Sequence, residues 1–293
     1  MSKIEQSEEL AAACLAACQN VQTACEGGED CCTENVPSAC EGDDCCIVVD
    51  KVGIRYGSHV AMKDVSLRIR ANKVTAIVGP SGCGKSSFLY CLNRLNDMVP
   101  NCEVSGCISF DFFQGAAAPD HALRRQIGML FQKPNPFPFS IWRNLEFPLM
   151  QHGVKDKAEL AAKIERALMD VGLWDEVKDK LHKPALTLSG GQQQRLCLAR
   201  ALILQPSVLL MDEPCSALDP LSTRKIEELI RSLSATITII LVTHNMAQAR
   251  RVADYVALFW SEGNSGRLLE YGTAREVFDS PKSELTRSYL AFA

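Results

Sequence analysis

No stretch of the 293 residues approaches the roughly 18–20 consecutive apolar residues that a membrane-spanning helix needs. Any role at a membrane is therefore expected to be peripheral and to depend on a partner. Hydrophobic residues make up 47% of the chain and charged residues 23%, which is typical of a globular protein. A chain of this length can bury one large core or two small ones.

The chain also lacks a recognisable secretion signal and any Cys-x-x-Cys pair, although it contains 14 cysteines. Disulfides are therefore not expected in the body of the protein. Eight of the cysteines lie in residues 1–46. This stretch also holds ten acidic residues and one lysine, so it carries −9, which leaves +5 for the rest of a chain of net charge −4. Such acidity argues against nucleic acid as a partner.

Residues 1–46 are predicted to be an acidic, Cys-rich extension without fixed structure. A second interpretation is that the cysteines bind zinc or another soft metal. Their spacing is irregular for a tetrahedral site, which favours the first interpretation.

Residues 47–293 are predicted to form one folded unit in which strands and helices alternate. This alternation favours a parallel sheet covered by helices. Residues 133–190 contain three prolines in a short loop and then only helical patterns, which predicts a helical subdomain inserted into the sheet domain. The clearest strands are expected at 74–78, 127–131, 208–211, 237–242 and 256–260, and helices at 140–152, 155–171, 174–181, 190–204, 221–233 and 246–252.

The strongest motif is a phosphate-binding loop between a strand and a helix. The pattern Gly-x-x-x-x-Gly-Lys-Ser/Thr is matched at every fixed position by Gly79-Pro80-Ser81-Gly82-Cys83-Gly84-Lys85-Ser86. Backbone N–H groups of such a loop form an anion site at a helix N-terminus. Lys85 is then expected to reach the β- and γ-phosphates of a nucleotide, and the Ser86 hydroxyl to bind Mg²⁺.

Four further residues fit a nucleotide-hydrolysing site because each follows a predicted strand. Asp212 is expected to hold Mg²⁺, and Glu213 to polarise the attacking water. His244 is expected to contact the γ-phosphate or to steady Glu213, although a lone histidine is more often structural. Gln132 is expected to sense both Mg²⁺ and water at the border of the helical subdomain.

A second anion site is predicted where Ser189, Gly190 and Gly191, here called the Ser-Gly-Gly loop, open a helix. One nucleotide has a single γ-phosphate, so two copies of the chain related by a two-fold axis can each offer this loop to the other's nucleotide. Tyr56, which precedes the phosphate loop, is a candidate for stacking on adenine.

In this order, the motifs resemble those of the ATP-binding-cassette ATPases, and the resemblance covers residues 47–293. Within the family the chain is most similar to the ATP-binding subunits of bacterial phosphate importers. The stretches that carry the resemblance are residues 79–86, Gln132, 188–192, 212–213, Ser216-Ala217-Leu218-Asp219 and His244, and for the subfamily 92–97, 131–138, 173–178, 189–195 and 267–272.

The resemblance implies a P-loop NTPase fold of the cassette type, with a parallel-sheet core, an N-terminal antiparallel portion and an inserted helical subdomain. It implies ATP and Mg²⁺ as cofactors, and a homodimer in which each nucleotide lies between residues 79–87 of one chain, Ser87 included, and the Ser-Gly-Gly loop of the other. Asp219 is carried over as a further residue near the nucleotide.

The resemblance also implies partners and a location. Two transmembrane permease subunits would dock near Gln132 at the cytoplasmic face of the cell membrane. An external phosphate-binding protein would deliver the anion, and a regulatory protein of phosphate signalling is a further expected partner. The alternatives are an importer ATPase for an amino acid or another oxyanion, and a cassette ATPase outside transport.

Three features depart from the family pattern. Residues 1–46 have no counterpart, the stretch 114–121 is short, and Cys215 stands where Thr or Ser is usual. Cys83 lies in the phosphate loop at a helix N-terminus, where a thiol pKa can be lowered, so redox sensitivity is a further hypothesis.

Overall fold

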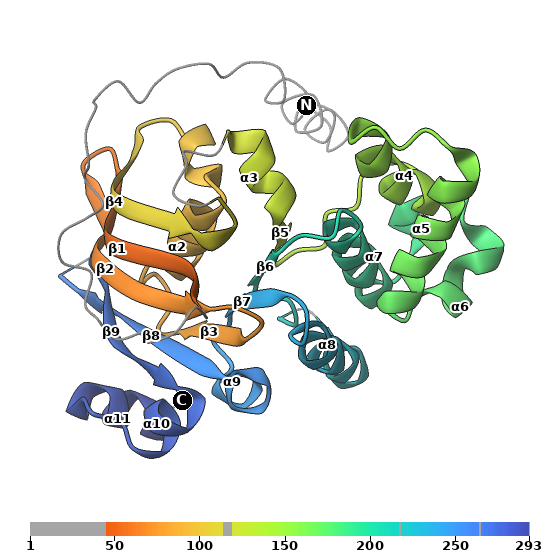
Figure 1. Cartoon of the computed structure of the whole chain (residues 1–293). Helices are drawn as coiled ribbons and strands as arrows, with labels where there is room; N and C mark the ends of the chain where they lie inside the picture. Colours follow the sequence, from red (N-terminus) through yellow and green to blue (C-terminus); the bar gives the residue numbers. More distant parts are fainter. Residues whose placement is uncertain (1–44, 114–118, 217, 264, 293) are drawn as a thin grey trace, which may run out of the picture.

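The computed structural model describes residues 45–113, 119–216, 218–263 and 265–292, and the prediction for the N-terminal extension lies almost entirely outside them. The described residues form a nine-stranded sheet in the order β4-β1-β2-β9-β8-β3-β7-β6-β5 (Figure 1). The strands are β1 Cys45–Tyr56, β2 His59–Arg70, β3 Val74–Val78, β4 Cys102–Phe110, β5 Ile127–Leu130, β6 Val208–Asp212, β7 Thr238–Val242, β8 Tyr255–Glu262 and β9 Ser265–Thr273.

The sheet has a parallel part and an antiparallel part. Strands β8, β3, β7, β6 and β5 pair in parallel, whereas β4 with β1, β1 with β2 and β8 with β9 pair antiparallel. The predicted α/β fold with a parallel core and an N-terminal antiparallel portion is therefore confirmed. Every residue of β3, β6 and β7 is buried, as expected for parallel strands covered on both faces.

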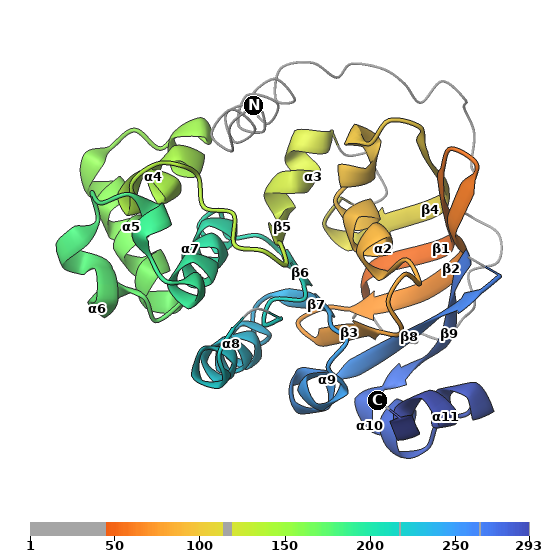
Figure 2. The same ribbon diagram turned by 180° about the vertical axis from the view of Figure 1, so that it is seen from behind.

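Helix α2 lies between the two parts of the curled sheet (Figures 1 and 2). Its Phe88 and Leu89 are fully buried and pack in one cluster with residues from β1 and β2 on one side and from β6 and β7 on the other. Since side chains alternate along a strand, Val208 and Leu210 of β6 face α2, while Leu209 and Met211 face the opposite cluster. Asp212 continues the first series, which points it toward α2.

The helices α4 to α7 lie together beside β5, at the end of the sheet away from β4 (Figure 2). Ser140 and Asp156 cap α4 and α5 by accepting hydrogen bonds from the backbone N–H groups of Arg143 and Glu159. No strand occurs in residues 133–190, all of which are described. The helices are α2 Lys85–Leu92, α3 Asp120–Gln126, α4 Ile141–Gln151, α5 Lys157–Asp170, α6 Trp174–Val177, α7 Gly190–Leu202, α8 Pro220–Leu233, α9 Met246–Val252, α10 Ala274–Asp279 and α11 Glu284–Phe292.

Some elements differ from the sequence-based expectation. The first strand begins at Cys45, so Cys45, which pairs with Arg70, and Cys46 belong to the sheet and not to the extension. Strand β9 is polar and contains two glycines, which hides it from pattern analysis, yet it pairs with β8 along its length. No helix among the described residues is long and apolar enough to cross a bilayer.

Candidate active site

The phosphate loop connects β3 to α2, and its glycines are required by geometry. Gly79 has φ 145° and Gly84 has φ 87°, which few residues with a side chain adopt. A Cβ atom at Gly79 would also lie 2.1 Å from the Phe259 carbonyl oxygen. Lys85 begins α2, and its buried ammonium donates hydrogen bonds to the carbonyls of Gly79 (2.8 Å) and Pro80 (2.7 Å). This places a positive charge beside the uncapped N-terminus of α2.

Ser86 and Asp212, the two residues predicted to bind Mg²⁺, are hydrogen-bonded to each other next to the phosphate loop. The Ser86 hydroxyl donates to Oδ1 of Asp212 at 3.1 Å, and the Tyr90 hydroxyl donates to Oδ2 at 3.0 Å. Burial raises the pKa of Asp212, and the nearby charge of Glu213 adds to this, against the opposing hydrogen bonds. A hydroxyl and a carboxylate are hard ligands, so this pair fits Mg²⁺.

Glu213 immediately follows β6 and is held by residues that follow the two neighbouring strands. Its Oε2 accepts a hydrogen bond from Nε2 of Gln132 at 2.8 Å, and its Oε1 lies 2.9 Å from Nδ1 of His244. Glu213 has φ 45°, and its N–H donates to the Val242 carbonyl, so the backbone turns sharply here. The structure thus brings together Gln132, Glu213 and His244, three of the four polar residues predicted to follow strands.

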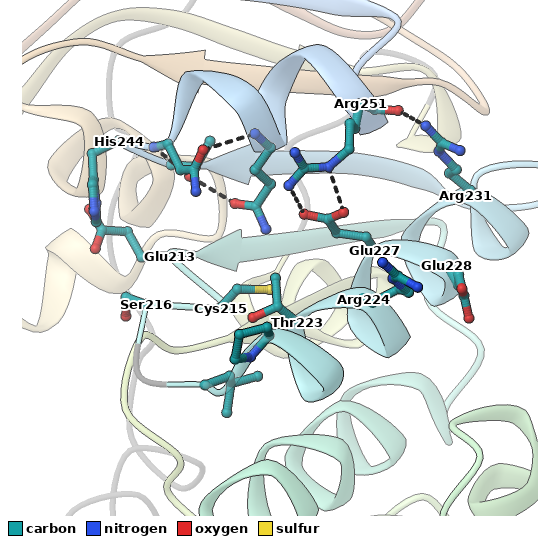
Figure 3. Close-up of a pocket in the computed structure, with 15 residues that line it drawn as sticks. Glu213, Cys215, Ser216, Thr223, Arg224, Glu227, Glu228, Arg231, His244 and Arg251 are labelled. Carbon is teal, nitrogen blue, oxygen red and sulfur yellow. Dashed lines mark hydrogen bonds and ion pairs between the residues drawn. The ribbon is translucent and has the colours of Figure 1, made fainter. Parts of the chain in front are cut away.

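A cleft of about 830 Å³ opens next to this group (Figure 3). Glu213 and His244 lie at one end, and α8 and α9 form its walls. At the other end Arg251 makes two hydrogen bonds to Glu227, of 2.9 Å and 2.7 Å. The carboxylate of Glu213 therefore stands at the border of a solvent-filled space, where a water molecule can reach it.

The Ser-Gly-Gly loop has the geometry of a capped helix N-terminus. Ser189 and Gln192 form a capping box, in which the Ser189 N–H donates to Oε1 of Gln192 at 3.1 Å and the Gln192 N–H donates to Oγ of Ser189 at 3.4 Å. Ser189 and Gly190 are exposed, and a Cβ at Gly190 would meet nothing within 4 Å. Among the described residues, no hydrogen bond joins this loop to the phosphate loop of the same chain.

Comparison with known proteins settles the family. A family model described as ABC transporter matches residues 62–216. This chain belongs to the ABC transporter family.

Curated relatives and a solved structure agree with that assignment. The chain is 54% identical over 247 residues to Phosphate import ATP-binding protein PstB 1 of Nitrosococcus oceani. This match covers 84% of this chain and 89% of the relative. It is 52% identical over 246 residues to Phosphate import ATP-binding protein PstB of Cytophaga hutchinsonii, which covers 83% and 97%. The structure of cbiO1 from Clostridium perfringens, part of the ABC transporter complex cbiONQ, has a TM-score of 0.68 and 28% identity, and the match covers 81% of this chain and 92% of that one.

Three other predicted site residues, Tyr56, Ser87 and Asp219, are either half-buried or already hydrogen-bonded within the chain. The Tyr56 hydroxyl donates to Oδ1 of Asn96 at 3.3 Å, and burial raises its pKa. Asp219 caps α8 by accepting hydrogen bonds of 3.0 Å from the N–H groups of Leu221 and Ser222. Ser87 is half-buried in α2, and Ala217 lies outside the described residues. The nucleotide contacts of Tyr56, Ser87 and Asp219 remain predictions.

Gln132 contacts Glu213 through its amide, and no described hydrogen bond joins it to Ser86 or Asp212, the two residues predicted to bind Mg²⁺. Tyr90, in contrast, was not foreseen as a site residue, although it lies four positions after Ser86. That spacing puts the two side chains on one face of α2 and is the signal that would have identified it.

The redox hypothesis for Cys83 is not supported by its environment. Its thiol is fully buried, and burial raises its pKa although the charge of Lys85 opposes the shift. A raised pKa leaves little thiolate at neutral pH, and burial denies access to an oxidant. The helix N-terminus therefore does not make Cys83 a reactive cysteine.

Proposed function

We propose that this chain is the ATP-hydrolysing subunit of an ABC importer that takes up phosphate, acting at the cytoplasmic face of the cell membrane. The observation that carries the ATPase part is the Glu213 carboxylate, held by Gln132 and His244 beside the phosphate loop. The phosphate part is supported by the names of two relatives that are more than half identical to this chain.

In the proposed reaction, Lys85 and the backbone N–H groups of residues 79–87 other than Pro80, which has none, bind the phosphates of ATP. Ser86 and Asp212 would hold Mg²⁺, which would supply positive charge to neutralise the charge that develops on the phosphate oxygens. Glu213 orients a water molecule toward the γ-phosphate and accepts its proton. Gln132 and His244 keep the carboxylate in place, and His244, which is largely exposed, is also placed to donate to the γ-phosphate.

The unit that hydrolyses ATP is proposed to be a homodimer. Within one chain the Ser-Gly-Gly loop makes no described hydrogen bond to the phosphate loop. The Ser189 N–H donates to Gln192, so the N–H groups of Gly190 and Gly191 are the ones proposed to bind a nucleotide held by a second copy. Closure on ATP and opening after hydrolysis would then move the attached subunits. Residues 47–293 are proposed as the cassette, 133–190 as its helical subdomain and 1–46 as an extension.

The proposed partners are two transmembrane permease subunits, with an external phosphate-binding protein and a phosphate-signalling regulator acting through or on that complex. The loop of residues 133–139 is a rigid docking element for a permease. Phe137 is held under the guanidinium of Arg200, which lies 4.1 Å from the ring centroid, and Phe139 is exposed.

Uptake of labelled solutes tests this proposal. The chain is expressed in a bacterial strain that lacks its own phosphate-import ATPase, together with the permeases encoded beside it. Phosphate uptake is expected with the natural chain and not with the Glu213→Gln variant, while uptake of glutamine and sulfate is the same with both. If glutamine or sulfate uptake responds instead, the alternative importer is correct.

A further inference from the structure

Gln194 occupies a junction between three parts of the site that the sequence motifs treat separately. It lies in α7, five positions after Ser189, and is 1% exposed. Its side-chain Nε2 donates to the carbonyl of Phe131 at 3.2 Å and to the carbonyl of Pro214 at 3.3 Å. Phe131 immediately precedes Gln132, and Pro214 immediately follows Glu213. One amide thus joins the helix of the Ser-Gly-Gly loop to the backbone on both sides of the Gln132–Glu213 hydrogen bond.

The carbonyl oxygen of the Gln194 side chain suggests that a contribution to stability is not the only reason for a glutamine at this position. The side-chain Oε1 of Gln194 is buried and has no hydrogen-bond partner among the described residues. Leaving a buried acceptor unsatisfied is unfavourable, and an apolar side chain of the same size would avoid that penalty. The two donated bonds therefore favour a role in fixing the two loops relative to α7.

Helix α7 is also attached firmly to the helical subdomain. Arg195, the next residue, donates to the Gly172 carbonyl at 2.6 Å and forms an ion pair of 2.9 Å with Glu176 of α6. Glu176 in turn accepts a hydrogen bond of 2.8 Å from Gln192 in the capping box. A displacement of the subdomain would therefore carry α7 with it, and the hydrogen bonds of Gln194 link α7 directly to the backbone next to Gln132 and Glu213.

We propose that Gln194 is a positioning residue that couples engagement of the Ser-Gly-Gly loop to the placement of Gln132 and Glu213. The inference rests on the proposed ATPase function. Gln194 touches neither nucleotide nor water. It holds the loops that carry the residues which do, so its loss is expected to slow hydrolysis and leave nucleotide binding by the phosphate loop unchanged.

The variant Gln194→Met keeps the volume of the side chain and removes the Nε2 group that donates both hydrogen bonds. Its kcat for Mg²⁺-dependent ATP hydrolysis is expected to fall about 10- to 100-fold, since misplacement by about 1 Å can have that effect, while the Kd for ATP stays within about twofold. The matched control is Gln126→Met. Gln126 accepts a hydrogen bond from Ser207 at 2.8 Å near the amino ends of β5 and β6, away from the site, and its kcat should stay near that of the natural chain.

Gln194→Asn keeps the amide but is one methylene shorter, so it cannot reach both carbonyls, and an intermediate loss of kcat is expected if Gln194→Met fails to fold. A double-mutant cycle with Gln132→Ala then separates positioning from general destabilisation. If Gln194 acts through Gln132, the double variant is about as slow as Gln132→Ala alone. The inference is overturned if both Gln194 variants keep kcat within about twofold, or if the two losses multiply. Absence of hydrolysis by the natural chain would instead overturn the proposed function.

Discussion

Gln132 and Glu213 are joined by a hydrogen bond of 2.8 Å although 81 positions separate them in the chain. The sheet explains this contact, because β5 and β6 are parallel neighbours and both residues follow the carboxyl ends of their strands. His244 follows β7, the next strand in the sheet, and completes the arrangement from the other side. A carboxylate held from both sides by groups on adjacent strand ends has little freedom to turn away from the phosphate loop.

Replacing Lys85 by methionine is expected to abolish tight nucleotide binding. The ammonium has two charge-assisted hydrogen bonds to loop carbonyls in the free chain and would exchange them for phosphate oxygens. Hydrogen bonds to charged groups contribute about 1.5–3 kcal/mol each, so the Kd for ATP should rise about 100-fold or more. Titration calorimetry measures this, with the exposed Lys73→Met as the control of equal charge change. An unchanged Kd would show that Lys85 does not bind the phosphates.

Asp212→Asn is expected to separate stability from catalysis. Because the folded-state pKa of Asp212 is raised, its ionised form is disfavoured in the fold. Its contribution to stability is therefore full below the unfolded pKa and is lost as pH rises through the folded value. At pH 7 the variant should unfold at the same temperature as the natural chain or at a higher one. Any such increase in unfolding temperature should become smaller at pH 4–5. Its Mg²⁺-dependent ATPase activity should fall about 100-fold or more.

The comparison variant for this pH dependence is Asp219→Asn. Hydrogen bonds from Ser222 lower the pKa of Asp219, which gives the opposite sign. Stability from Asp219 is present above its unfolded pKa and is lost as pH falls, so its replacement should give no gain at pH 7. Thermal unfolding from pH 4 to 8 measures both variants. A clear loss of stability at pH 7 in Asp212→Asn would contradict the account of its burial.

Removal of residues 1–44 is expected to leave ATPase activity and thermal stability nearly unchanged, because the sheet starts at Cys45. Removal of residues 1–49 should instead be damaging. It deletes Ile47 and Val49, which are 0% and 2% exposed. Burial of each contributes about 1.5–3 kcal/mol, so the unfolding temperature should drop by several degrees. If the shorter deletion already abolishes activity, the extension is a working part of the protein.

Much of this architecture could be predicted from the sequence, because its central strands are short apolar runs that end in polar residues. Asp212 and Glu213 were identifiable from their place after such a run. Contacts that depend on the order of strands in the sheet could not be predicted from the sequence. The hydrogen bond of Tyr90 to Asp212 spans 122 positions and requires α2 to lie against β6, which no local pattern specifies.

Cys83 shows a second limit of sequence reasoning. Its place at a helix N-terminus was visible in the sequence, and the expected lowering of the thiol pKa followed from it. Burial is the larger effect, and it depends on packing between α2 and the curled sheet. Strand β9 was missed for a related reason, since its pairing with β8 and not its composition defines it.

The central claim is that ATP binds between two copies of this chain and that Glu213 promotes its hydrolysis. Light scattering of the Glu213→Gln variant with ATP and Mg²⁺ tests it most directly. The account predicts that the mass doubles from 32.2 kDa and that two unhydrolysed ATP molecules stay bound to the dimer. A variant that remains at the monomer mass with ATP and Mg²⁺ bound would contradict the account.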